Sequence, residues 1–305
     1  MAIVSPAEVV HSLESSDALS AGALGFMPRI LVLTTLPHRR PGSHRVERVK
    51  GRHRLRMSAS RRVGLPYGSY PRLLLVYLTT EAVRTKTPEI HLGATPNDLA
   101  RKLGLSTISG PRGTARRLEN QLHRLLQMRL EWQTSFGLAP RSPGSACVTA
   151  SVTWELNPLR RLFPIRPKWQ SHVLLGHNFF AEITRSAVPV DLRAIRHLQR
   201  SPLAIDLYVW LTYRMSYLRK PTLIPWKSLQ AQFGAAYARP RDFRRKVLVQ
   251  LEAVLSAYPT IRIGEDAIGL RLYPSAPHVM PSGRPTRTGF VLGEGLIAER
   301  RSCLP

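Results

Sequence analysis

The residues with the most evident chemistry are a dense group of cations between positions 239 and 246. Five of these eight residues are basic, namely Arg239, Arg241, Arg244, Arg245 and Lys246. Arginine donates paired hydrogen bonds to phosphates and to the edge of guanine, whereas lysine acts as a point charge. Apolar residues follow at helical spacing, so a helix here buries one face and presents the cations on the other. The pattern predicts a contact with nucleic acid, and a solvated helix face is the alternative.

A second, sparser group of cations precedes and begins an earlier predicted helix. Arg112, Arg116 and Arg117 belong to it, and Glu119 interrupts it. We expect these arginines to contact DNA phosphates, with a dimer interface as the alternative.

A third group alternates along a predicted strand. Arg52, Arg54 and Arg56 are separated by single residues, so the three side chains share one face of the strand. This face is either a ribbon that contacts phosphates or a solvated surface.

The charge of the whole chain favours a polyanionic partner. The 305 residues include 45 Lys and Arg against 19 Asp and Glu, which gives a net charge of +26. Nucleic acid is the polyanion that such a chain most often meets. Because only 7 of the 45 basic residues are lysine, the composition is also consistent with GC-rich codon usage.

Six elements are predicted to position the second group of arginines. A helix begins near Pro71, and Thr95 followed by Pro96 is typical of the start of another. The order is helix, strand, helix, helix, strand, loop, strand, which is the order of a winged helix. The expected bounds are a helix from Pro71, a strand at Glu89–Leu92, a helix from Thr95 to Gly104, a helix at Thr114–Met128, and strands at Arg129–Thr134 and Cys147–Leu156.

The same order recurs about 130 residues later, as a search for internal repeats shows. Trp210 corresponds to Tyr77, Leu229 to Leu99, and the cations at 244–246 to Arg116 and Arg117. We therefore expect an α+β, mainly α chain with two tandem winged-helix domains and an N-terminal strand segment.

The connecting segments carry further expectations. Ile30–Thr35 is an apolar run that predicts a buried strand, and Val46–Ala59 predicts two strands that turn near Lys50. Pro189–Gln199 is predicted to be a helix, and Ser201 to cap the next one. Prolines after Pro274 indicate the end of packed structure. The expected parts are a disordered leader (1–26), basic N-terminal strands (27–64), two winged-helix domains (65–185 and 186–275, the second reading the DNA) and a tail (276–305).

Catalytic patterns are weak by comparison. The sequence has no phosphate-binding loop of the G-x-x-x-x-G-K-[ST] type, and its acidic residues are scattered. His172 and His177 lie in an apolar run and do not have the spacing of the metal ligands of a rolling-circle nickase. Two cysteines, Cys147 and Cys303, are too few for a zinc site or a disulfide framework. We expect no enzymatic activity, no cofactor and no metal.

Several motifs resemble the RepA-type plasmid replication initiators. They are Gly64–Ser69, Pro71–Leu75, Thr80–Lys86, Leu103–Leu105 and the stretch from Ser201 to Lys246, and Leu36–Arg39 also fits. The resemblance covers about residues 30 to 280. It implies binding to direct repeats (iterons) of duplex DNA at a plasmid origin, local melting of an AT-rich stretch, and recruitment of the host initiator and replicative helicase. Related initiators bind as monomers, and their dimers are inactive or repress their own gene, so a homodimer is a possible partner.

The alternative function is a winged-helix transcriptional repressor that does not melt DNA. The N-terminal residues have the wrong charge order for a secretory signal, and no apolar run is long enough to cross a membrane. We therefore expect a cytoplasmic protein with no membrane contact.

Overall fold

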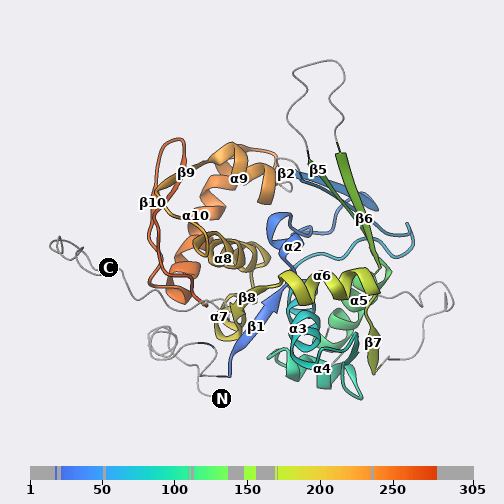
Figure 1. Cartoon of the computed structure of the whole chain (residues 1–305). Helices are drawn as coiled ribbons and strands as arrows, with labels where there is room; N and C mark the ends of the chain where they lie inside the picture. Colours follow the sequence, from blue (N-terminus) through green and yellow to red (C-terminus); the bar gives the residue numbers. More distant parts are fainter. Residues whose placement is uncertain are drawn as a thin grey trace, which may run out of the picture.

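Two groups of elements lie side by side in the computed structural model of the chain (Figure 1). The structure describes residues 18, 22–50, 53–108, 110, 113–136, 148–155, 169, 171–234 and 237–279. One group, on the right of Figure 1, is formed by the first predicted module and the N-terminal strands, and the other is formed by the second module.

The first module has the predicted order of elements. Its first helix is long, its second helix is short, and its third helix leads directly into a pair of strands. The elements are α3 (Ser69–Thr85), β4 (Glu89–His91), α4 (Pro96–Lys102), α5 (Thr114–Gln127), β5 (Arg129–Phe136) and β6 (Val148–Glu155).

The second module repeats this order element by element. Its elements are α8 (Pro202–Met215), β9 (Thr222–Pro225), α9 (Trp226–Phe233), α10 (Pro240–Ala257), β10 (Ile263–Glu265) and β11 (Gly269–Leu272). The prediction of two winged-helix modules in tandem, in an α+β chain rich in helix, is confirmed.

Local sequence explains where the helices begin. Thr95 accepts a hydrogen bond from the backbone of Asp98, whose side chain accepts one from the backbone of Thr95, which completes a capping box at α4. Ser201 caps α8 by accepting from the backbone of Ala204. Such caps satisfy N–H groups that have no partner inside the helix.

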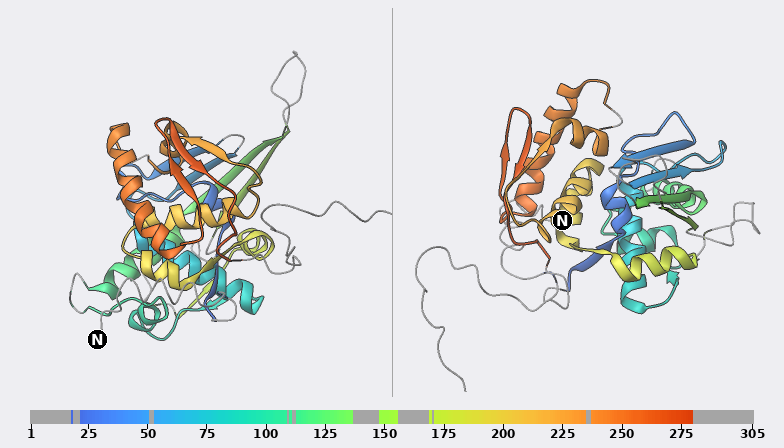
Figure 2. Two further views of the ribbon diagram at one scale, coloured as in Figure 1. Left: turned by 90° about the vertical axis from the view of Figure 1, so that its left-hand side faces the viewer. Right: turned by 45° about the horizontal axis from the view of Figure 1, so that its top comes forward.

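The wings of the two modules differ in their sheets. In the second module β9, β11 and β10 form one three-stranded sheet. In the first module β5 and β6 are extended by β2 (Arg45–Lys50) and β3 (His53–Ser58), in the order β2-β3-β5-β6. The expected strand pair that turns near Lys50 is confirmed, because Lys50 pairs with His53. Figure 2 shows these blue strands beside the green strands of the wing.

The first module's β4 also has a partner of its own. It pairs with β7 (His172–Leu174), which follows the wing in the chain. Helix α6 (His177–Ser186) comes next and packs against α3.

The predicted strand at Ile30–Thr35 is wrong. Residues Arg29–Leu33 form a short helix, α2, and the Thr34 hydroxyl donates a hydrogen bond to the carbonyl of Ile30. Ile30, Leu31 and Val32 are all buried, because α2 packs between the modules against α8. A short run that is apolar on every side has no period that separates a helix from a strand.

Two predicted boundaries, the end of the leader and the start of the helix at Pro189–Gln199, differ from those in the structure. One pair of strands explains both differences. Leu24–Met27 forms β1, although residues up to 26 were expected to belong to a disordered leader. Its partner β8 (Val188–Asp191) takes the start of the predicted helix at Pro189–Gln199, and the helix itself, α7, is Leu192–Leu198. Only the tertiary pairing of β1 with β8 specifies these short strands.

The chain stays packed beyond Pro274, contrary to expectation. Val279 is 2% exposed, and the His278 ring stacks on Tyr258 with 4.7 Å between ring centroids. Nδ1 of His278 is also 2.7 Å from the Tyr208 hydroxyl of α8. The segment after β11 therefore covers part of the second module's core.

Buried polar contacts join the two modules. Arg72 of α3 donates from Nε and Nη2 to the two carboxylate oxygens of Asp206 in α8, each at 2.7 Å. The side chain of Gln232 in α9 donates to the carbonyl of Val32, and Thr35 donates to the carbonyl of Gln232. One apolar core runs through both modules. Within the described residues, no helix is both long and apolar enough to cross a membrane.

Candidate nucleic-acid interface

The third helix of the second module, α10, has one buried face and a second face with exposed cations. Phe243, Val247 and Leu251 are buried on one side. Arg241 and Lys246 are exposed on the other and have no hydrogen bond or ion pair within the described residues. Arg239, the residue before the first turn, is exposed as well.

Two of the four cations within this helix have acidic neighbours. Arg245 is 81% exposed, and its Nη2 lies 3.9 Å from Asp242, which is a loose contact. Arg244 has closer partners, because its Nη2 lies 2.6 Å from Glu265 in β10 and its guanidinium lies 5.3 Å from the centre of the Trp226 ring. Arg244 thus ties α10 to its wing.

The third helix of the first module, α5, exposes Arg116 and Arg117 near its start. Leu118, Leu122 and Leu125 of this helix are buried on the opposite side. Arg112, the third predicted cation of this group, lies outside the described residues.

The arginines of β3 are placed on one exposed face, but they share an acidic partner. Arg54 and Arg56 are exposed, whereas Leu55 between them is buried, as alternation predicts. Glu47 of β2 lies 3.3 Å from Nε of Arg54 and 2.8 Å from Nε of Arg56. The hydrogen bond from Arg56, together with the charges of both arginines, lowers the pKa of Glu47. Arg52 lies outside the described residues.

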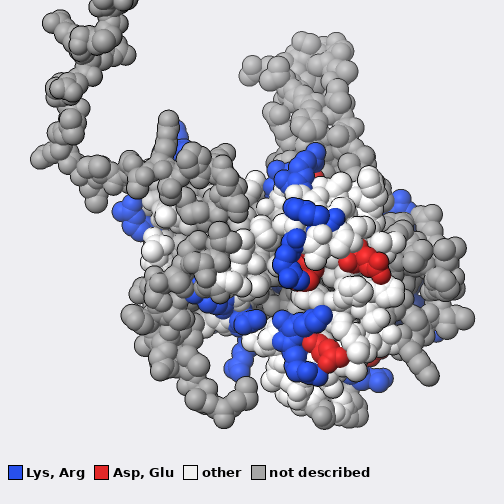
Figure 3. Space-filling view, turned by 60° about the horizontal axis from the view of Figure 1, so that its bottom comes forward, with Lys and Arg blue, Asp and Glu red and all other residues white. Residues whose placement is uncertain are grey.

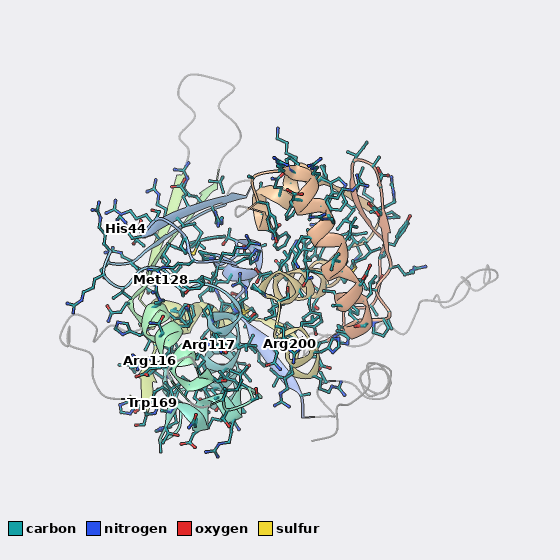
Figure 4. All side chains as sticks on the ribbon, turned by 180° about the vertical axis from the view of Figure 1, so that it is seen from behind. His44, Arg116, Arg117, Met128, Trp169 and Arg200 are labelled. Atoms are coloured by element: carbon teal, nitrogen blue, oxygen red, sulfur yellow. The ribbon has the colours of Figure 1, made fainter. Side chains whose placement is uncertain are left out.

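A groove between the two modules brings basic residues of distant segments together. It has a volume of about 870 Å³, and no Asp or Glu lines it. Figure 4, seen from behind relative to Figure 1, labels three of its arginines in a row that runs from Arg116 and Arg117 in the first module to Arg200 beside the second. The basic residues of this groove are Arg39, Arg40, Arg116, Arg117 and Arg200.

Two smaller hollows each share a lining arginine with this groove. The first, of about 570 Å³, shares Arg39 with the groove and reaches Asp242, Arg245 and Lys246 of α10. The second, of about 450 Å³, shares Arg40 and is lined by Arg61, Arg62, Arg124 and His44. We call the three hollows together the basic groove, because they share Arg39 and Arg40 and their lining includes residues of both α5 and α10.

Sequence reasoning missed five residues of the basic groove. These are Arg39, Arg40, Arg61, Arg62 and Arg200. The adjacent pairs Arg39-Arg40 and Arg61-Arg62 were visible in the sequence, each close to a glycine. Their distance along the chain from α5 and α10 concealed the common surface.

The segment that carries Arg39 and Arg40 is anchored by the buried ion pair between the modules. Arg72 donates from Nη2 to the carbonyl of Leu36 at 2.7 Å, and Nε2 of His38 lies 2.8 Å from Asp206. Gly68 donates from its backbone to the carbonyl of Pro37. These contacts hold the backbone that precedes Arg39 and Arg40 in place.

Electrostatics in this anchor keep Asp206 ionised and His38 neutral. Burial raises the pKa of Asp206, but the positive charge of Arg72 and the hydrogen bonds from His38 and Arg72 outweigh it and lower the pKa overall. Burial lowers the pKa of His38, more than the bond with Asp206 raises it. An ionised carboxylate only accepts, so Nε2 of His38 carries the shared hydrogen.

A different face of the molecule has mixed charge. Figure 3, turned so that the bottom of Figure 1 comes forward, shows acidic side chains directly beside basic ones. At the ends of α3 and α4, Arg84 pairs with Glu81 and Arg101 pairs with Asp98. Such exposed pairs leave little net charge for an anion. In the part of the chain that the structure describes, no three His, Cys, Asp or Glu side chains gather as metal ligands.

Comparisons with known proteins concern the family and the fold of the chain. The family model described as plasmid-encoded RepA protein matches residues 65–227. Among solved structures, the chain is similar in fold to domains 2 and 3 of RctB, with a TM-score of 0.50, 13% sequence identity, and coverage of 91% of this chain and 100% of that chain. No curated protein matches the chain.

Proposed function

Because the chain belongs to the family of plasmid-encoded RepA proteins, we propose that it starts plasmid replication by binding iterons of duplex DNA. The observation that carries this proposal is the basic groove, which joins the exposed sides of α5 and α10 in one surface. In a winged helix the third helix enters the major groove. Two such helices on one surface fit two successive major grooves, and the contact covers roughly 20 base pairs.

The cations of α10 have different roles in DNA recognition. Arg241, Arg245 and Lys246 are exposed near the start of the helix, where base edges come within reach. Arg244 is a positioning residue, since its contacts with Glu265 and Trp226 fix the helix against the wing. Arg116, Arg117, Arg61 and Arg62 contact phosphates and supply affinity without sequence choice.

We attribute origin melting to the rigid connection between the modules, which forces the bound duplex to bend. The buried pair of Arg72 and Asp206 fixes the modules relative to each other, so the DNA is the partner that adapts. Bending a site of this length by tens of degrees costs about 1 to 6 kcal/mol, which the contacts of the second module offset. The strain then favours opening of a neighbouring AT-rich segment, on which the host initiator and helicase assemble.

Permanganate footprinting on a supercoiled plasmid with the cognate origin tests this function. Permanganate oxidises unpaired thymines, so the full chain is expected to make thymines beside the iterons reactive. The variant Arg241→Ala removes an exposed cation of α10 and is expected to reduce both DNA binding and thymine reactivity. Protection of the iterons without reactive thymines identifies a repressor, and absence of protection refutes the proposal.

A further inference from the structure

The segment between the two groove-reading helices has a distinctive place in the molecule. Arg39 lines the hollow beside α10, Arg40 lines the hollow beside Arg61 and Arg62, and both line the central part of the basic groove beside α5. We call residues 36–40 the arginine arm. It lies between α5 and α10 on the surface that holds both.

The arm is rigid at its base and exposed at its tip. Leu36 and Pro37 are buried, and their carbonyl oxygens accept hydrogen bonds from Arg72. The His38 side chain is only 7% exposed and is bonded to Asp206. Arg39 and Arg40 follow immediately and are exposed. Two exposed charges are thus presented from a fixed backbone, which lowers the ordering cost of a contact made by their side chains.

The charges at the tip are available to an anion. Within the described residues Arg40 has no hydrogen bond or ion pair, and Arg39 contacts only the ring of Tyr237, 5.8 Å from its centre. Tyr237 in turn packs edge-on against Phe243 of α10, with 5.6 Å between ring centroids. Arg39 is therefore positioned relative to α10 without a loss of charge.

The geometry of B-DNA defines what faces this arm. On one side of a duplex, two successive major grooves are separated by a minor groove. A surface that places α5 and α10 in those major grooves must place whatever lies between them over that minor groove. Minor grooves of A-tracts are narrow and carry an enhanced negative potential that attracts inserted arginine. Arginine suits this contact because its guanidinium is more weakly hydrated than an ammonium.

We propose that Arg39 and Arg40 enter the minor groove at the centre of each binding site, and that the chain thereby selects A·T base pairs there. This inference rests on the proposed function, because it requires α5 and α10 to occupy neighbouring major grooves. It adds a specificity determinant outside both winged-helix domains. The base pairs concerned are those between the two sets that α5 and α10 contact.

Binding to a matched set of duplexes tests the proposal. The site is first selected from random duplexes with the full chain, and its central base pairs are then changed to A·T, G·C or inosine·cytosine. Inosine lacks the N2 amino group that guanine places in the minor groove, while its major-groove edge is the same as that of guanine. We expect A·T centres to bind about tenfold tighter than G·C centres, near the lower end of the cost of a mismatched pair. Inosine·cytosine centres should bind like A·T.

Variants of the full chain assign this preference to the arm. The double variant Arg39→Ala/Arg40→Ala is expected to bind all three duplexes with similar affinity. The Arg39→Lys/Arg40→Lys variant keeps the charge and is expected to keep affinity for G·C centres while losing part of the A·T preference. Arg84→Ala, which removes one exposed arginine at the end of α3, is the control and should keep the full preference.

Distinct outcomes overturn the inference and the proposed function. If the double alanine variant loses affinity equally for all three duplexes, the arm contacts phosphates only. This result refutes the reading of the minor groove. Inosine·cytosine centres that bind like G·C centres refute it as well, as does a wild-type chain without any central preference. Failure of the selection to yield any site refutes the proposed function instead.

Discussion

At the scale of residues, cations that look equivalent in the sequence have different surroundings. Arg244 and Arg245 are neighbours, yet Arg244 is held by Glu265 and Trp226 while Arg245 is 81% exposed. A side chain that already has close partners within the protein is a poor candidate for hydrogen bonds to bases. The exposed Arg241 and Arg245 are better candidates for contacts with guanine, each worth about 1 to 3 kcal/mol of discrimination.

This difference gives a testable prediction for three alanine variants. At least one of Arg241→Ala and Arg245→Ala is expected to relax specificity at a single position of the iteron. Arg244→Ala should weaken binding to every duplex alike, because the helix loses its fixed angle to the wing. Affinities for a panel of single-base variants measure both effects. If Arg244→Ala relaxes one position alone, it contacts a base and our assignment is wrong.

At the scale of elements, the segment after β11 is part of the second module. His278 bridges the rings of Tyr208 and Tyr258, and Val279 is buried. Burial strongly raises the pKa of Tyr208, which therefore stays a neutral hydrogen-bonding group. Because α8 is buried along almost its whole length, loss of this cover exposes the core directly.

Two truncations of the full chain test this role. A chain ending at residue 275 is expected to be less stable than one ending at residue 280, by about 1 to 3 kcal/mol for one buried apolar side chain and its neighbouring hydrogen bonds. Urea denaturation followed by circular dichroism measures the free energy of unfolding. Equal stability of the two chains would show that residues 276–280 contribute nothing to the fold.

At the scale of the whole molecule, one buried ion pair decides how the modules are joined. Arg72 is fully buried, and with Asp206 and His38 it connects α3, α8 and the arginine arm. Removal of one partner from a buried pair leaves an unpaired charge, which costs about 3 to 5 kcal/mol. Arg72→Met should therefore lower the free energy of unfolding by this amount. The double variant Arg72→Met/Asp206→Leu, which removes both charges, should recover much of the loss, and failure to recover it argues against the pair as the cause.

The same cluster predicts the direction of the pH dependence. The pKa of His38 is below its ordinary 6.5, and that of Asp206 is below its ordinary 3.8. Both groups bind protons more readily in the unfolded chain, so the free energy of unfolding falls as the pH falls. The contribution of His38 is lost below about pH 6.5, and that of Asp206 only below about pH 4. Denaturation between pH 8 and 5 measures the first loss, which His38→Gln should abolish.

The net charge of the molecule makes a prediction about salt. With +26 overall and the basic groove, we expect 6 to 10 phosphate contacts, so affinity should fall by roughly 10³ to 10⁵ between 50 and 200 mM salt. A logarithmic plot of affinity against salt concentration measures the slope. A nearly flat plot would refute a nucleic-acid partner.

The sequence by itself determined the two modules and the helices that carry their cations. Helical periodicity, the caps at Thr95 and Ser201, and the recurrence of one order of elements are local signals, and each follows from residues close together in the chain. The tertiary structure alone decided α2, the pairing of β1 with β8, the partner of Arg244 and the position of the arginine arm. These features depend on contacts such as that between Arg72 and Asp206, which are 134 residues apart. No pattern within a short window specifies such a contact, because its energy arises only when both modules have folded against each other.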